Sequence, residues 1–235
     1  MSSIQATRIV ALSTTILNAH GVPRSAATIV AASLVKSNLL GHDSHGVMRL
    51  PRYLDYMMQG KIAPRAQPVV VRKRGTIAAI DGKWAFGQIG ARFECDAVAK
   101  LARRHGTASV ALHQVMHIGR LGEYAEALAQ QGFAVLVLTS NGGPGNAVAP
   151  FGGRDRIFGT NPMAFAVPGS SSHAPLVVDF ATAATAEGKL AVAKAAGEKV
   201  EAGALVDRDG APSVDPGAFY EGGALLPFGA HKGYG

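Results

Sequence analysis

The chain has 235 residues, of which 48% are hydrophobic and 17% charged, with a formal net charge of +7 and a single cysteine, Cys95. So apolar a composition excludes a disordered chain, and a lone cysteine excludes both a disulfide framework and a thiolate zinc site. No apolar run reaches the about 18 residues of a membrane span and no secretory signal opens the sequence, so we expect a cytoplasmic protein without a membrane partner.

The N-terminal part of the chain is expected to be helical. Apolar periodicity predicts three helices, over 7–18, 25–40 and 47–59. Short apolar runs replace this pattern further along the chain. We therefore divide the chain into a helical region, 1–66, and an α/β region, 67–235.

Strands and helices alternate in the second region. Strands are predicted over 68–72, 76–80, 108–112, 133–139, 163–167 and 176–179, and helices over 89–105, 121–131 and 183–196. Residues 212–223 are rich in turn formers and are expected to form a surface loop. Because β-α-β units are mixed with a hairpin candidate, the pattern predicts an α/β fold with a mixed sheet.

The segment GHDSHGVMRLPRY, residues 41–53, carries the richest chemistry. If a helix begins near Gly46, then His45, Arg49 and Arg52 share one face, with Tyr53 beside them. Arginine suits a carboxylate, and histidine is the usual proton donor or acceptor near neutral pH. The alternative is a helix start that Ser44 caps, with solvated arginines.

A second histidine, His117, follows a predicted strand in the segment HIGRLG. Loops at the carboxyl ends of strands are where α/β folds place ligands, and Gly119 and Gly122 permit close approach of a backbone. A plain structural turn explains the same residues.

Three further loops could bind a ligand. NGGPGN follows the strand over 133–139, Asp179 ends another strand, and GAHKGYG closes the chain. Asp179 either accepts a ribose hydroxyl or caps the following helix. The chain contains neither the G-x-G-x-x-G fingerprint nor a P-loop, so no Rossmann or Walker site is expected. No metal site is expected, because His42 and His45 lack a third clustered ligand.

The positive charge is concentrated in the first half of the chain. Residues 1–120 hold 16 Lys and Arg against 5 Asp and Glu, whereas residues 121–235 hold 7 against 11. Aromatic side chains make up only 6% and do not alternate with the basic ones, as a base-stacking surface requires. We therefore expect a small anionic partner and no nucleic acid.

Five segments, in this order, resemble the malate/L-lactate dehydrogenase family of non-Rossmann NAD(P)-dependent oxidoreductases: 41–53, 117–126, 149–168, 179–189 and 223–235. The resemblance implies a mixed-sheet α/β core of the L-sulfolactate dehydrogenase-like type beside a helical N-terminal part. It also implies a homodimer that transfers a hydride between NAD or NADP and C2 of a small 2-hydroxy or 2-oxo acid.

The resemblance carries residue roles onto the matching positions. His45 matches the group that exchanges a proton with the substrate oxygen, and His117 matches a second catalytic histidine. Arg49, with Ser44 and Tyr53 nearby, matches the substrate-binding group. The positions that match cofactor contacts are Ser140, Asn141, Asp179, Phe180, Ala181, Thr182, Lys232 and Gly233.

The chain departs from the family pattern in two places. Residues 114–116 read Gln-Val-Met where many members have an Asn-Ser type sequence, and the chain ends at Gly235, before the further elements of longer members. Two alternatives to a working dehydrogenase follow. One is a truncated, catalytically inactive product that binds cofactor or dimerises, and the other is a cyclic imino acid reductase of the same family.

Overall fold

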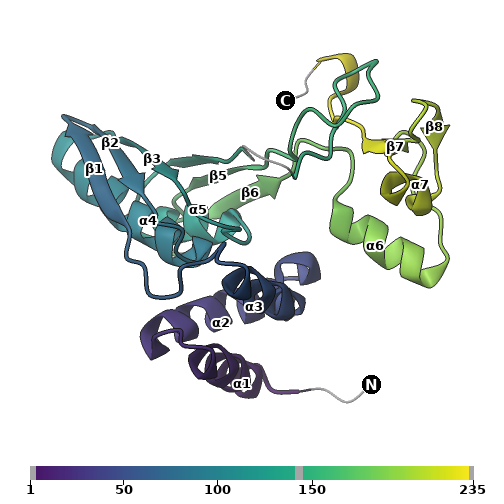
Figure 1. Cartoon of the computed structure of the whole chain (residues 1–235). Helices are drawn as coiled ribbons and strands as arrows, with labels where there is room; N and C mark the ends of the chain where they lie inside the picture. The colour runs from purple at the N-terminus through teal and green to yellow at the C-terminus, as the bar shows by residue number, and fades with distance from the viewer. Residues whose placement is uncertain (1–3, 141–144, 233–235) are drawn as a thin grey trace. The chain divides into compact units, whose positions relative to one another are not determined.

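The computed structural model describes residues 4–140 and 145–232 (Figure 1). Contacts within the chain divide it into two compact units, Met1–Phe133 and Ala134–Gly235. The expected boundary at residue 66 falls inside the first unit, where the second N-terminal helix, α2 (Arg24–Leu39), packs against α4 (Gly87–His105).

The first unit begins with helices α1 (Ala6–Ala19), α2 (Arg24–Leu39) and α3 (Leu50–Met58). The first two confirm the predicted helices. The third begins later than residue 47 because Val47–Arg49 is a short 3-10 turn. Pro51 lies in the first turn of α3, where its missing N–H leaves no hydrogen bond unmade. The buried core of this part is Leu17, Val22, Ala26, Ala27, Val30, Leu34, Leu50, Tyr53, Ile62 and Phe86.

A three-stranded sheet completes the first unit, with α4 packed against it and α5 (Gly122–Ala129) following. Its strands are β1 (Val69–Arg74), β2 (Ile77–Asp81) and β3 (Ser109–His113). The first two form the predicted hairpin, which pairs Arg74 with Ile77. β3 runs parallel to β2 after the crossover through α4, so this sheet is mixed, as predicted.

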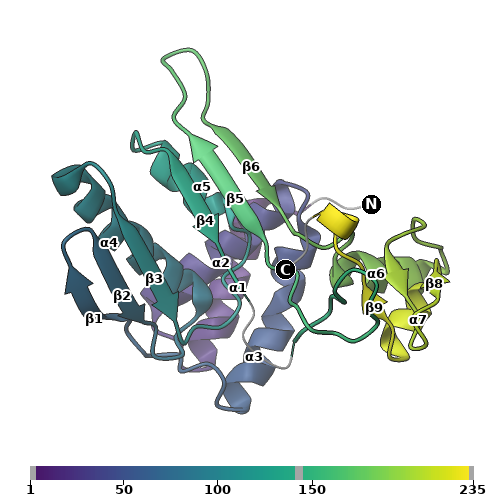
Figure 2. The same cartoon turned by 90° about the horizontal axis from the view of Figure 1, so that it is seen from above.

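The second unit contains an antiparallel sheet of β4 (Val135–Leu138), β5 (Met163–Val167) and β6 (Leu176–Phe180), in that order (Figure 2). All three strands were expected from their apolar runs. Side chains alternate between its faces, and Ala164 and Ala166 of the central strand are fully buried.

A smaller sheet, in the order β8-β7-β9, lies further along the second unit. Its strands are β7 (Leu205–Val206), β8 (Pro212–Ser213) and β9 (Ala224–Leu225). It is accompanied by α6 (Glu187–Ala196), α7 (Pro216–Tyr220) and the 3-10 turn η3 (Ala230–Lys232).

Two predictions fail in this part of the chain. Residues 212–223 are not a plain surface loop, because they hold β8 and α7, whose Phe219 is buried and whose first turn is capped by the Asp215 carboxylate. The helix expected from residue 183 begins at Glu187 instead, because Ala183 forms a bridge with Pro227 and the Ala184 N–H donates to the Leu226 carbonyl at 2.7 Å.

Taken together, the elements confirm the predicted α/β class with helices and mixed strands. No helix within residues 4–140 and 145–232 is long and apolar enough to cross a membrane.

Glu94, on α4, is a partly buried carboxyl group whose pKa is raised by burial from its ordinary 4.5 to about 7. The folded state therefore holds more protons than the unfolded state between these values, so stability falls as pH rises through this window. We expect Glu94→Gln to raise the free energy of unfolding by about 1–3 kcal/mol at about pH 8.5 and to change it little near pH 4.

Urea denaturation at the two pH values measures this effect. Asp96→Asn, at an exposed acidic position of the same helix, is the matched control and should show no such pH-dependent gain. An equal change for Glu94→Gln at both pH values would contradict the assigned cause.

Candidate functional site

The loop that carries His45 is held by a side chain from α2. Asn38 Oδ1 accepts the Val47 N–H at 2.8 Å, and Asn38 Nδ2 donates to Asp43 Oδ1 at 2.5 Å. Arg49 Nε in turn donates to the Ser44 carbonyl at 2.5 Å. The alternative in which Ser44 caps a helix is therefore wrong, because Gly46 occupies the cap position and Asn38, from a separate helix, binds the free N–H.

Gly46 is required by this arrangement, since a Cβ atom there would lie 2.3 Å from Asn38 Oδ1. We expect Gly46→Ala to push the Asn38 amide away and to lower the free energy of unfolding by about 1–2 kcal/mol. Asn38→Ala should have a similar effect because Val47 N–H loses its acceptor.

The double variant tests whether the two effects share one cause. Once Asn38 is alanine, Gly46→Ala meets no amide and should add little, so the two changes should be strongly non-additive in a double-mutant cycle. Additive losses measured by thermal or urea unfolding would show that Gly46 acts through some other contact.

The structure brings His45 and His117 together across 72 residues of chain. Nδ1 of His45 lies 2.9 Å from Nε2 of His117, and the two rings are parallel within 1°. The hydroxyl of Tyr53, on α3, lies 2.7 Å from Nδ1 of His117. Both nitrogens of His117 are thus engaged, whereas Nε2 of His45 has no hydrogen-bond partner among the described residues.

Arg49 lies close enough for its charge to act on both imidazoles. Arg52 Nε donates to the Tyr56 hydroxyl at 2.8 Å and its guanidinium lies over the Tyr56 ring, so Arg52 acts on the group only through its charge, which helps to lower the pKa of His117. The predicted shared face assumed a helix from Gly46. The 3-10 turn before Leu50 changes the angular spacing and directs Arg52 to the exposed side.

Burial keeps the histidines neutral. It lowers the pKa of His45 from 6.5 to about 4 and that of His117 well below its usual value, and the Arg49 charge adds to both effects. Burial also raises the pKa of Tyr53 to about 12. Near neutral pH the group therefore consists of two neutral imidazoles and a protonated phenol beside a guanidinium cation.

Gln88, in the first turn of α4, is a member of this group that the sequence analysis missed. Its side chain is fully buried, and its Nε2 donates to the Tyr53 hydroxyl at 2.8 Å. The available signal was a glutamine among the buried glycine and alanine positions of an amphipathic helix. A buried polar side chain needs a partner, but the sequence does not reveal which one.

Most of the positions expected to contact cofactor lie in the second unit. Asp179 and Phe180 end β6, and the Phe180 ring packs edge-on against Phe228, with 5.6 Å between ring centroids. Thr182 N–H donates to the Thr160 carbonyl at 2.9 Å. Of the others, Ser140 and Lys232 are exposed and Ala181 is partly buried, whereas Asn141 and Gly233 lie outside the described residues.

Asp179 does not cap the following helix. It is part of β6, where it pairs with Ala164, and the cap residue of α6 is Ala186, which makes no side-chain cap hydrogen bond. The capping alternative fails because the chain turns after β6 before the helix begins.

The turn that follows β6 fits a ligand that brings hydrogen-bond donors. Thr182 Oγ1 donates to the Asn161 carbonyl at 3.1 Å, and Asn161 has the unusual φ of +33°. The side-chain oxygen of Asn161 is buried and has no partner among the described residues. Such an oxygen accepts an amide or hydroxyl proton readily, and a nicotinamide nucleotide carries both kinds of donor.

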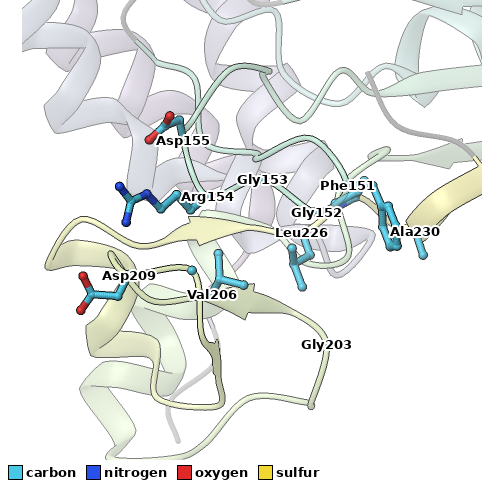
Figure 3. A pocket seen from close by; sticks show the side chains of 12 residues that line it. Phe151, Gly152, Gly153, Arg154, Asp155, Gly203, Val206, Asp209, Leu226 and Ala230 are labelled. Carbon is cyan, nitrogen blue, oxygen red and sulfur yellow. The ribbon is translucent and has the colours of Figure 1, made fainter.

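The second unit also has a cavity of about 720 Å³. Glycine backbones and the side chains of Arg154, Asp155 and Asp209 contribute to its lining, as Figure 3 shows. None of the described residues that are predicted to bind cofactor lines it. The described residues contain no cluster of three or more His, Cys, Asp or Glu that could hold a metal ion.

The first unit therefore holds two hydrogen-bonded histidines beside an arginine cation, in an α/β chain without a Rossmann fingerprint. Such a group is chemically able to exchange a proton with a small anionic molecule. Comparison with known proteins identifies the family. The family described as malate/L-lactate dehydrogenase matches residues 4–235, and the chain belongs to that family.

Relatives with known names and structures agree with this membership. Hydroxycarboxylate dehydrogenase B of Escherichia coli K12 is 40% identical over 91% of the chain. Δ1-piperideine-2-carboxylate reductase from Pseudomonas syringae superimposes with a TM-score of 0.91 at 33% identity, covering 99% of this chain and 69% of that one. Sulfolactate dehydrogenase from Methanocaldococcus jannaschii gives 0.87 at 34% identity, covering 97% and 65%, which confirms the predicted fold type. The chain spans 59% of the length of the E. coli relative.

Proposed function

We propose that this chain is an NAD- or NADP-dependent oxidoreductase that acts at C2 of a small 2-oxo or 2-hydroxy acid. The observation that carries the proposal is Nε2 of His45, which has no hydrogen-bond partner among the described residues. The other ring nitrogen, Nδ1, contacts His117, and the charge of Arg49 acts on the ring. A proton at Nε2 and a cation beside it suit an oxygen next to a carboxylate.

In the direction of reduction, His45 Nε2 gives a proton to the substrate oxygen as C2 is reduced. The nicotinamide supplies the hydride when it is bound. Arg49 holds the carboxylate and so fixes the position of C2, while Ser44 keeps the Arg49 side chain in place through its backbone carbonyl. His117 cannot reach the substrate oxygen with a free nitrogen, because both of its nitrogens are engaged by Tyr53 and His45.

We propose that the cofactor is held by the second unit. The residues assigned are Ser140, Asn141, Asp179, Phe180, Ala181, Thr182, Lys232 and Gly233, which match family positions. The Asn161 side-chain oxygen, which finds no partner in the described part of the chain, supports the assignment, since a bound nucleotide would give this oxygen a donor beside Thr182. The activity panel described next, run with NADH and with NADPH, also tests which of the two cofactors is used.

The test is a spectrophotometric panel that follows oxidation of NADH and of NADPH with 2-oxo acids. We expect turnover with at least one 2-oxo acid and one of the two cofactors. If calorimetry shows that the protein binds cofactor and the protein turns over nothing in the panel, the alternative of a non-catalytic product replaces the proposal.

Cyclic imino acids form the second candidate class, and similarity to the P. syringae reductase favours including them. Their C=N bond also lies next to a carboxylate, and its nitrogen also needs a proton, so His45 and Arg49 would serve unchanged. A higher kcat/KM with Δ1-piperideine-2-carboxylate than with every 2-oxo acid would assign the chain to this class.

We also propose that the protein is a homodimer of the cytoplasm. The family resemblance supports the dimer, as does an exposed apolar face of the sheet β4-β5-β6, formed by Leu136, Leu138, Phe165, Leu176, Val178 and Phe180. A face of this kind marks an interaction surface. Sedimentation should show a dimer that Phe165→Lys weakens, and a native monomer at micromolar concentration would refute the proposed dimer.

The proposal of a cytoplasmic protein is supported by the single cysteine, which suits a reducing compartment.

A further inference from the structure

A row of four polar side chains leads inward from the free nitrogen of His45. His45 Nδ1 lies 2.9 Å from His117 Nε2, His117 Nδ1 lies 2.7 Å from Tyr53 Oη, and Gln88 Nε2 donates to Tyr53 Oη at 2.8 Å. Tyr53 is only 1% exposed and Gln88 is fully buried. The inner end of the row is therefore shielded from water, and each proton position depends on its neighbour in the row.

Gln88 sets the direction of all these hydrogen bonds. Its amide N–H can only donate, so the Tyr53 oxygen accepts there and its own proton is left for Nδ1 of His117. A neutral imidazole that accepts at Nδ1 carries its proton on Nε2, and His117 therefore donates to Nδ1 of His45. By the same rule His45 carries its proton on Nε2, the nitrogen that faces no protein partner among the described residues.

We propose that Gln88 is a positioning residue that fixes His45 as the Nε2–H tautomer and so presents a proton, rather than a lone pair, to the substrate oxygen. The catalytic consequence rests on the proposed function, whereas the tautomer itself does not. Burial lowers the pKa of both histidines and raises that of Tyr53, which agrees with three neutral members in the row.

Stability does not explain a glutamine at this position. Its Oε1 is buried and has no hydrogen-bond partner among the described residues, which is unfavourable for folding. A methionine of similar length would fill the space without that unpaired oxygen. The part of the side chain that makes a contact is the N–H, and this contact is the one that orients Tyr53.

The row also accounts for the proton that His45 gives away. When Nε2 releases its proton to the substrate oxygen, Nδ1 takes one from His117 Nε2, and His117 Nδ1 takes one from Tyr53. The final state has two neutral imidazoles and a Tyr53 phenolate. Burial raises the pKa of Tyr53 and so opposes this charge, and the Gln88 N–H hydrogen bond offsets part of that cost, which makes the phenolate a short-lived state. After product release, a proton from water enters at His45 Nε2 and the shifts reverse, so the net donor is solvent.

The decisive measurement is the histidine tautomer in the whole protein, without substrate or cofactor. Two-bond ¹H–¹⁵N correlation spectra of histidine-labelled protein distinguish an imidazole protonated at Nε2 from one protonated at Nδ1. We expect both His45 and His117 as Nε2–H tautomers near neutral pH. An Nδ1–H tautomer at either residue in the native protein would overturn the proposal.

Two variants of Gln88 test its role. In Gln88→Glu at about pH 9.5 the buried carboxyl is ionised and only accepts, so Tyr53 must donate to it and both histidines should switch to Nδ1–H. Gln88→Met removes the donor without reversing it, so the spectra should show a mixture of tautomers. A folded Gln88→Glu protein that keeps both native tautomers would overturn the proposal. If Gln88→Glu does not fold, a folded Gln88→Met protein that keeps both native tautomers would overturn it instead.

Activity gives an independent comparison. We expect the rate of reduction to fall about 100-fold in Gln88→Glu and about 10-fold in Gln88→Met, since acid–base assistance contributes about 10²–10⁴-fold. A folded Gln88→Glu protein with switched tautomers and an unchanged rate would remove the role in catalysis. An inactive native protein with the expected tautomers would refute the proposed function alone, whereas an active protein with the opposite tautomers would refute only the role of Gln88.

Discussion

His45→Gln is expected to lower kcat for reduction of the best 2-oxo acid by about 10²–10⁴-fold, with a smaller change in KM. Glutamine fills a similar space and can still meet His117, but its amide does not give up a proton to a developing alkoxide. If Arg49 binds the carboxylate as proposed, substrate affinity should largely persist in this variant. Steady-state kinetics with each cofactor measure both quantities.

His42→Gln is the matched control, because His42 is an exposed histidine of the same loop. It should retain native kcat. If His45→Gln remains as active as the control, the proton comes from elsewhere and the proposed mechanism fails.

The His45→Gln variant also tests the electrostatics of the site. The pKa of His45 is lowered from 6.5 to about 4, mainly by burial, so the unfolded state binds more protons between these values. Native stability therefore falls as pH decreases through this window. His45→Gln removes that contribution, so its stability should depend less on pH between about 6.5 and 4 than that of the native protein.

Much of the fold follows from local pattern, because many of its helices and strands carry a recognisable apolar run or stripe. The helices α1 and α2 and the hairpin β1-β2 lie close to the residues expected from periodicity. The errors occur where tertiary contacts override local propensity. Residues 212–223 look like a loop because they contain proline and glycine, yet packing of Phe219 and the Asp215 cap form a short helix there.

The candidate site shows the same division. His45, Arg49 and His117 could be singled out because their residue types and flanking glycines are informative in sequence. The contact between two histidines 72 residues apart could not be inferred from spacing, since it depends on how the turn that holds His45 and the loop after β3 approach each other. Gln88 and Asn38 carry no motif of their own and become meaningful only through the groups that they bind.

Gly87, the first residue of α4, connects packing to this site most directly. A Cβ atom at Gly87 would lie 2.3 Å from the carbonyl oxygen of His117 and 2.4 Å from that of Met116. Both are backbone atoms, so no side chain can rotate out of the way. We expect Gly87→Ala to lower the free energy of unfolding by about 2–3 kcal/mol and to displace His117 from Tyr53 and His45.

The displaced loop should also lower kcat by at least about 10-fold, because an acid–base group depends on its hydrogen-bond geometry. Gly106→Ala, at the other end of α4, separates the two effects. Gly106 has a φ of +82°, and a Cβ atom there would meet nothing within 4 Å, so alanine introduces backbone strain without touching the site. It should lose about 1 kcal/mol of stability and keep native kcat. Both variants weaken the same helix. A Gly87→Ala protein with the same kcat as Gly106→Ala would therefore mean that α4 supports the fold but does not position His117.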